Sequence, residues 1–161
     1  FNHPVKELVW VCQSDVSVTR RQYNNYGTRS KGYSDNEGNA WNDGRAYDVM
    51  YGSVRTQNPV SKAKLTLNGH DRFAERDGDY FNYVQPYQHH TRSPSVGINV
   101  YSFALKPEEH QPSGTCNFSR IDNASLQLTL QDSNARKLRV YAVNYNVLRI
   151  MSGMGGLAYS N

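Results

Sequence analysis

The sequence lacks most features that would assign it to a chemical class. It has 161 residues but only two cysteines, Cys12 and Cys116, too few for a disulfide framework, and we expect both to be buried free thiols. The longest stretch without Asp, Glu, Lys or Arg is residues 93–105, whereas a membrane-spanning helix needs about 20 apolar residues. No window reaches the run of about 5–8 basic residues typical of a nucleic-acid patch, and the net charge is only +4. We therefore expect no direct membrane span and no specific nucleic-acid partner.

Motifs for catalysis and metal binding are also scarce. The five histidines are scattered, and no H-E-x-x-H or C-x-x-C spacing occurs, which argues against a zinc site. Residues 35–39 resemble a calcium loop only loosely, because Ala40 and Ala46 stand where that loop needs Gly and Glu; an ion bound in another geometry is left open. No Ser/His/Asp set can be assembled from the spacing. We expect no catalytic residue, no metal site and no cofactor.

What the sequence does contain is a set of short β-type runs. Hydrophobic residues make up 37% and aromatic residues 12% of the chain, including 12 Tyr, which is too apolar and aromatic for a disordered protein. Apolar and β-branched residues alternate over short runs that are separated by turn residues such as Asn68-Gly69. We predict strands at residues 5–12, 63–67, 96–105, 115–120, 126–130 and 138–150, a last pairing at 157–159, and a short helix opening at 73–76. The class is all-β, a sandwich or barrel.

Residues 13–61 differ from the rest of the chain. This segment contains no Leu, Ile or Phe, yet it is rich in Gly, Asn and aromatic residues. It cannot supply a core of its own, but disordered linkers rarely carry so many aromatics. We predict one long ordered surface loop inserted between the first two strands, with Tyr33, Trp41 and Tyr47 as candidate contact residues.

Four segments together resemble a known family. They are NHPVKELVW (residues 2–10), YSFALKP (101–107), QPSG with NFSRIDN (111–114 and 117–123), and YNVLRIMSGMGGLAYSN (145–161). In order and spacing they are similar to the C-terminal part of the major capsid protein of nucleocytoplasmic large DNA viruses, nearest to the algal-virus and mimivirus-like branch. The four segments cover over a quarter of the chain.

The resemblance implies an incomplete fold. Proteins of this family carry two consecutive jelly rolls, and residues 1–161 would be one domain, the C-terminal part of the second. It would be an antiparallel sandwich holding strands D to I: D at residues 5–12, E near Leu65, F near Val100, G and H within 118–130 and 138–150, and I at 157–159. Strands B and C and the first jelly roll would be missing. The residues alone agree, because the chain starts at Phe1 without a signal peptide, so we expect a processed piece, a fragment or the end of a longer protein.

The resemblance also implies a structural function. The protein would form a homotrimeric, pseudo-hexagonal capsomer of an icosahedral virion capsid that is assembled in the host cytoplasm, and it would not be an enzyme. Its partners would be further copies of itself, neighbouring capsomers and minor capsid proteins. The loop at residues 13–61 would rise on the outer face of the capsomer.

Two other functions and one modification stay open on the residues alone. A carbohydrate-binding β-sandwich module would use Trp41 and Tyr33 for sugar stacking, and a nucleic-acid surface would stack bases on Tyr and Arg. The sequons that begin at Asn117 and Asn123 are candidate N-glycosylation sites.

Overall fold

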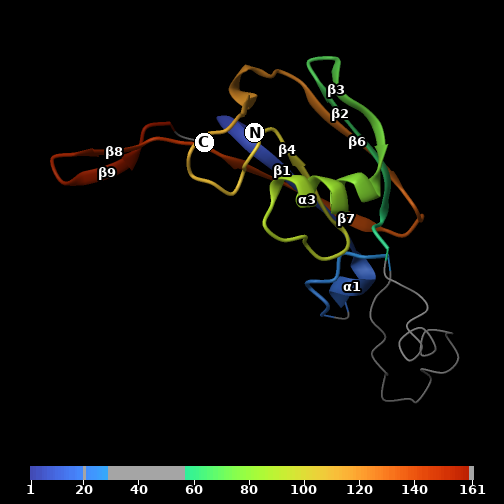
Figure 1. Cartoon of the computed structure of the whole chain (residues 1–161). Coiled ribbons are helices and arrows are strands. Elements are labelled where there is room, and N and C mark those ends of the chain that lie inside the picture. The colour runs from blue at the N-terminus through green and yellow to red at the C-terminus, as the bar shows by residue number, and fades with distance from the viewer. Residues whose placement is uncertain (20, 29–56, 160–161) are drawn as a thin grey trace, which may run out of the picture.

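The computed structural model describes residues 1–19, 21–28 and 57–159, and strands dominate them. Figure 1 shows the chain with its elements labelled. In order they are β1 (Pro4–Ser14), α1 (Asp15–Thr19), β2 (Val60–Leu67), β3 (His70–Asp77), the π-helical turn η2 (Tyr80–Val84), α3 (Gln85–His89), β4 (Ile98–Ser102), β5 (Cys116–Asn117), the 3-10 turn η3 (Phe118–Arg120), β6 (Ala124–Leu130), β7 (Arg136–Asn144), β8 (Leu148–Met151) and β9 (Met154–Leu157).

The strands form two antiparallel sheets and one separate hairpin. In the first sheet β7 pairs with one edge of β1 along most of its length, and β4 and β5 share the other edge. In the second sheet β2 lies between β3 and β6. β8 and β9 pair only with each other. The predicted all-β antiparallel class is confirmed.

The core lies between the two sheets and is centred on β1. Leu8, Trp10 and Cys12 alternate along β1 and are all buried against the second sheet. A register shift between Val5 and Glu7 in the ladder with β7 brings Val5 to the same side, because a β-bulge reverses the side-chain alternation. The Trp10 and Phe81 rings lie 5.2 Å apart, so the helical segment contributes directly to this core.

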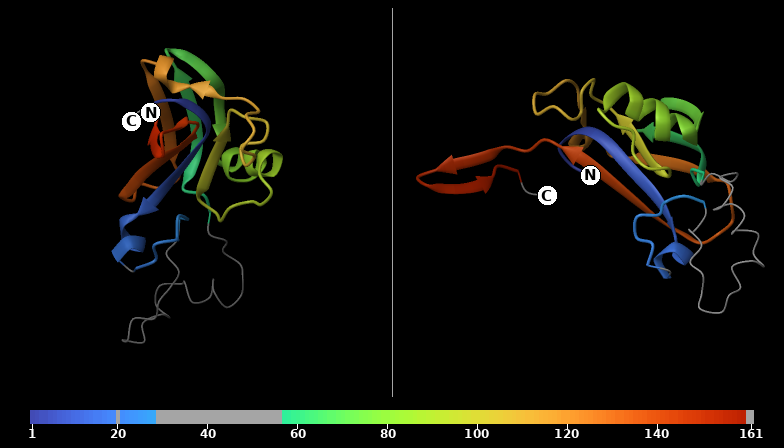
Figure 2. Two further views of the ribbon diagram at one scale, coloured as in Figure 1. Left: turned by 90° about the vertical axis from the view of Figure 1, so that its left-hand side faces the viewer. Right: turned by 60° about the horizontal axis from the view of Figure 1, so that its bottom comes forward.

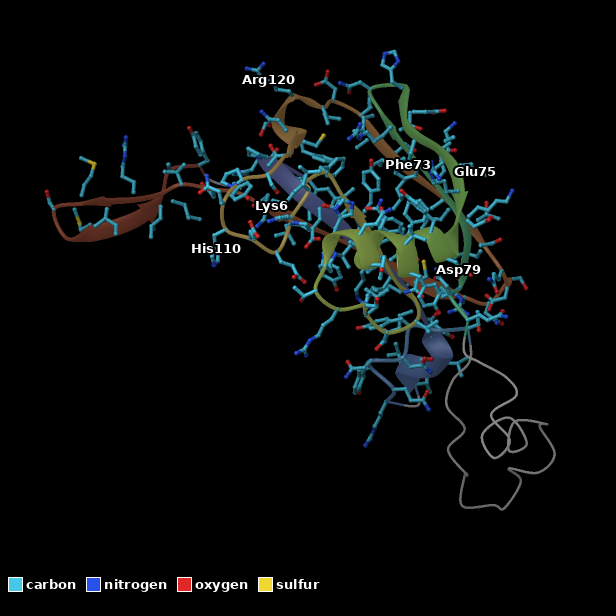
Figure 3. The ribbon with its side chains drawn as sticks, viewed as in Figure 1. Lys6, Phe73, Glu75, Asp79, His110 and Arg120 are labelled. Atoms are coloured by element: carbon cyan, nitrogen blue, oxygen red, sulfur yellow. The ribbon has the colours of Figure 1, made fainter. Side chains whose placement is uncertain are left out.

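The helix predicted to open at residues 73–76 is wrong. Asn68 (φ 49°) and Gly69 (φ 81°) form the left-handed corner of a two-residue hairpin, which forces the following residues to pair back onto β2 as β3. Phe73, labelled in Figure 3, is therefore a strand residue whose ring lies 4.7 Å from that of Tyr101.

Helical structure begins at Tyr80 and continues through α3. Its position is fixed by two contacts: Phe81 is fully buried in the core, and the Gln85 side-chain oxygen accepts a hydrogen bond from the Ser102 backbone N–H at the edge of β4. The chain reaches this segment through Gly78, where a Cβ would lie 1.8 Å from the Val60 carbonyl oxygen. Only glycine fits that approach.

The C-terminal strand pattern is also divided differently from the prediction. The strand expected at 138–150 is two strands. Pairing with β1 ends at Asn144, and β8 then pairs with β9 instead of β1. The strand expected at 115–120 shrinks to β5 and then coils into η3. The last pairing occurs at Met154–Leu157 instead of 157–159, since Ser152 and Gly153, both with positive φ, make the turn.

The number of strands fits the expected part of the fold. Apart from the two-residue β5, the two sheets hold six strands, in the orders β7-β1-β4 and β6-β2-β3. A complete jelly roll has eight strands, so six strands agree with the expected set D to I. Which letter belongs to which strand stays a prediction.

Candidate assembly surface

The most exposed apolar surface of the described chain is the β8–β9 hairpin. All eight of its strand residues are exposed, and Figure 2 shows the hairpin standing away from the sandwich. Ile150 is 69% exposed and Met154 74%. Single exposed apolar residues are ordinary, but a contiguous group marks an interaction site.

The register of the hairpin defines two faces. Residues directly opposite in an antiparallel pair share a face, so Leu148, Leu157, Ile150 and Gly155 lie on one side. We call this uncharged side the leucine face. The other side, the methionine face, holds Arg149, Met151, Met154 and Gly156, and Arg149 is the only charged residue of the two strands.

The root of the hairpin is held firmly to the sandwich. Tyr145 donates its backbone N–H to the Pro4 carbonyl (2.9 Å), and the Tyr159 ring, at the other end of the hairpin, lies 6.3 Å from the His3 ring. The Asn146 side-chain amide donates to the Tyr159 carbonyl (2.9 Å) and closes the base of the hairpin itself. The Lys6 ammonium group lies 4.8 Å from the centre of the Tyr145 ring, and Lys6 is seen near the root in Figure 3. The direction of the hairpin is thus set, although its strands are uncovered.

A second apolar area lies on the outer face of β7. Val140 and Ala142 pack on the core, whereas Tyr141 and Val143 alternate to the opposite side and are 53% and 40% exposed. Val9 of β1 pairs directly with Tyr141 and therefore shares this face. We call Val9, Tyr141 and Val143 the outer β7 patch. The predicted strand with apolar residues on both faces is confirmed for this part.

The four outer strands of the two sheets each have a free edge among the described residues. β7 and β4 pair only with β1, and β6 and β3 pair only with β2. Unpaired edges invite pairing with another segment, so the sandwich has room for further strands.

A polar cluster around Arg136 joins the first part of the predicted loop at 13–61 to the sandwich. Arg136, whose side chain is only 2% exposed, forms a bidentate pair with Asp132 and donates to the carbonyls of Cys12 and Gly27. The guanidinium group lowers the pKa of the Asp132 carboxyl below its ordinary value. The sequence did not predict this cluster, because nothing in the residues around Arg136 indicates that its side chain is buried or which carbonyls it contacts.

Two buried asparagines hold the returning end of the same segment. The Asn58 side chain donates to the side-chain oxygen of Asn99 and to the Gly78 carbonyl, and Asn58 and Asn99 are 2% and 0% exposed. Buried polar groups are stable when paired in this way. The predicted loop at 13–61 therefore has defined ends, although it begins within β1, includes α1 and ends within β2.

The candidate contact residues Tyr33, Trp41 and Tyr47 lie in 29–56, outside the described residues. The sequon asparagines are both described and both exposed. Asn117 accepts a hydrogen bond from the Ser119 backbone N–H and so begins the η3 turn. Asn123 pairs through its backbone with Asn68. Glycosylation at either position stays a prediction.

The reactive side chains of the described residues form no chemical centre. Cys12 and Cys116 are free thiols, and burial raises the pKa of each, which lowers their reactivity at neutral pH. In the part of the chain that the structure describes, no three His, Cys, Asp or Glu side chains could hold a metal ion. No described helix has the length and apolar character needed to cross a membrane.

Comparison with known proteins assigns the family. A family model described as the large eukaryotic DNA virus major capsid protein matches residues 1–156. The chain belongs to this family. The resemblance seen in the sequence is confirmed.

Relatives in the major capsid protein family agree along the chain. The major capsid protein of Phaeocystis pouchetii virus is 76% identical over 110 residues, covering 65% of this chain and 21% of the relative. That of Pyramimonas orientalis virus is 48% identical over 184 residues, covering 100% of this chain and 38% of the relative. This chain thus spans about two-fifths or less of these relatives.

Solved structures agree with the fold. The crystal structure of PBCV-1 VP54, fitted into a cryo-EM reconstruction of the virophage Sputnik, matches with a TM-score of 0.72 at 41% identity, covering 100% of this chain and 44% of that one. A quasi-atomic model of the PBCV-1 virus capsid matches with a TM-score of 0.68 at 39% identity, covering 100% of this chain and 44% of that chain. The jelly-roll sandwich is therefore the fold of a viral capsid protein.

Proposed function

We propose that this chain is the C-terminal part of the second jelly roll of a shell protein that builds an icosahedral virion. Three copies of the parent chain would close into a pseudo-hexagonal capsomer, and capsomers would tile the shell with the help of minor capsid proteins. Assembly would take place in the host cytoplasm.

The observation that carries this proposal is the combination of family membership with an unfinished surface. The chain matches the capsid family over residues 1–156, while the β7 and β6 edges, the outer β7 patch and the hairpin are left uncovered within the described residues. Upstream strands B and C would pair with the two edges. The remaining apolar surface would meet neighbouring subunits, because burial of such area drives association.

The function of this protein would be to bury apolar surface between subunits, and it would not catalyse a reaction. The polar side chains with the most extensive contacts, such as Arg136 and Asn58, are engaged in holding the backbone. The raised pKa of each cysteine suits a packing role. We therefore infer that the protein is not an enzyme and needs no cofactor.

Native mass spectrometry of capsomers released from purified virus particles tests the proposal. We expect three copies of a parent chain more than twice as long as this segment, and peptides of residues 1–161 within it. Single copies only, or absence of the chain from purified particles, would contradict the proposal.

A carbohydrate-binding module stays a hypothesis. It depends on Trp41 and Tyr33, which lie outside the described residues. Soaking the protein with a panel of sugars separates the two functions, since a saturable sugar site would favour the module and its absence would favour the shell protein.

A further inference from the structure

The helical segment formed by η2 and α3 lies beside β4 and bonds to its edge (Figure 1). Among the described strands β4 pairs with β1 alone, so its other edge has no strand. At that edge the Asn82 side-chain amide donates to the Ile98 carbonyl (2.8 Å). The Gln85 side-chain oxygen accepts from the Ser102 backbone N–H (3.1 Å). Ile98 and Ser102 are the first and last residues of β4, so side chains hold both ends of the edge.

The two carboxamides take the place of a neighbouring strand. The Phe103 backbone N–H donates to the Lys6 carbonyl of β1. Because successive residues of a strand turn their backbone groups to opposite edges, those of Ile98, Val100 and Ser102 face away from β1. A paired strand would offer them donors and acceptors. Here one carboxamide is the donor and the other is the acceptor.

Both carboxamides are fixed in place. Asn82 is 0% and Gln85 4% exposed, and Asn82 donates a second hydrogen bond to the Ser95 carbonyl (3.3 Å). The Gln85 amide nitrogen donates to the Tyr80 hydroxyl (2.9 Å), which leaves the oxygen of the same group to face the strand. The Arg76 guanidinium group lies 4.6 Å from the centre of the Tyr80 ring. The acceptor for Ser102 is thus held in its orientation before any other strand could approach.

We propose that Asn82 and Gln85 seal the β4 edge against strand addition, so that this sheet can gain a strand beside β7 and not beside β4. The inference rests on the proposed function only for the upstream strand at β7. The closed edge itself goes beyond that function and holds for any number of assembled copies.

A sealed edge suits a sandwich whose other edges are open. An exposed strand edge is a template for pairing with another chain, and proteins block such edges with short strands or with a covering helix. The β4 edge has both devices, because β4 has five residues against nine in β7 and the helical segment covers it. A strand that reached β4 would have to displace two buried carboxamides from their partners, which is unfavourable.

The seal can be tested in the full-length parent protein with substitutions that keep the side-chain shape and remove the hydrogen bonds. Gln85→Met removes the acceptor for Ser102, and a double variant adds Asn82→Leu. The control, Asn58→Leu, also removes a carboxamide that is only 2% exposed. The bonds of that group, to the Gly78 carbonyl and to another side chain, do not reach a strand edge.

Two measurements on dissociated subunits separate the seal from ordinary packing. Hydrogen exchange resolved to single amides reports whether the backbone of β4 is protected. Light scattering over a range of concentrations reports association, and each protein is measured equally far below its own unfolding midpoint, so that loss of stability alone does not change the result.

We expect Gln85→Met to speed exchange of the Ser102 amide by about tenfold or more, while the β1 amides keep their wild-type rates. The double variant should associate at a concentration about tenfold lower than the control does, because its β4 edge is open to a strand from another copy.

Two results would overturn the seal. One is an unchanged exchange rate for the Ser102 amide in Gln85→Met, which decides the matter even if the double variant does not fold. The other is a folded double variant that associates no more readily than the Asn58→Leu control. Neither result bears on the proposed function, which the number of copies in released capsomers tests separately.

Discussion

The sandwich and the hairpin use the same kinds of residue for opposite purposes. In the sandwich Trp10 is 1% exposed and Phe81 fully buried, whereas in the hairpin Ile150 is 69% exposed. The sandwich has two sheets with apolar faces turned toward each other, so each side chain has a neighbour to cover it. The hairpin has one layer and no second sheet on it in the described chain. Apolar character alone therefore does not say whether a strand belongs to the core of its own subunit.

This difference bears on how strands should be interpreted in shell proteins. Burial stabilises a subunit only if the covering surface belongs to the same subunit. The leucine face has the apolar content of a core strand, but its stabilisation would appear only upon assembly. A change in the sandwich and a like change in the hairpin should therefore differ in their effect on the stability of dissociated full-length subunits.

The largest contrast is expected for removal of a large apolar side chain. Trp10→Ala leaves a cavity beside Phe81 and should lower the free energy of unfolding by about 3–5 kcal/mol. Ile150→Ala removes a side chain that is already in water, and its effect should stay within about 0.5 kcal/mol. Urea denaturation measures both values. A loss above about 2 kcal/mol for Ile150→Ala would mean that the hairpin is buried within its own subunit.

A second contrast concerns glycine. Gly78→Ala places a methyl group 1.8 Å from the Val60 carbonyl oxygen, so the chain must shift at the entry to η2, at a cost of roughly 2–3 kcal/mol. Gly156→Ala meets open space at the edge of the hairpin and should be neutral or slightly stabilising. Thermal unfolding midpoints compare the two. Equal midpoints would show that the backbone at Gly78 yields without cost.

A smaller contrast is expected for charge. Asp132→Asn leaves the buried Arg136 guanidinium without its anion and should cost about 1–2 kcal/mol. Arg149→Gln removes an exposed charge of the hairpin and should cost less than about 0.5 kcal/mol. Chemical denaturation at neutral pH gives both numbers.

The Asp132 contrast should also depend on pH. The pKa of Asp132 is lowered in the folded protein, so its contribution is fully present above the unfolded pKa of about 4 and is lost as the pH falls through the folded pKa. The stability gap between wild type and Asp132→Asn should therefore close below about pH 4. A gap that is constant down to pH 2 would contradict the ion pair.

Much of the sandwich could be predicted from local patterns, because alternation reports directly which face of a strand is buried. β2 and β6 alternate, and β1 is a continuous apolar run of β-branched and aromatic residues, so each lies where expected. β3 failed because HDRFAERD carries a single apolar aromatic, Phe73, among charges, and an edge strand of this kind has no clear period. Its pairing is decided by the Asn68-Gly69 turn before it.

The candidate site was predictable only in part. The apolar character of residues 138–150 was evident in the sequence, but the break after Asn144 depends on where β1 ends as a partner, which no local pattern contains. The Arg136 and Asn58 contacts join residues far apart in the chain. Such long-range contacts follow from the fold and cannot be derived from the spacing of residues.

Hydrogen exchange on the full-length protein, assembled and dissociated, tests the contrast between the two regions most directly. We predict slow exchange for the β1 amides in both states, and slow exchange for the amides of β8 and β9 in the assembled state alone, with rapid exchange after dissociation. Hairpin amides that exchange equally slowly in the dissociated subunit would contradict the account, because the cover of the hairpin would then come from its own chain.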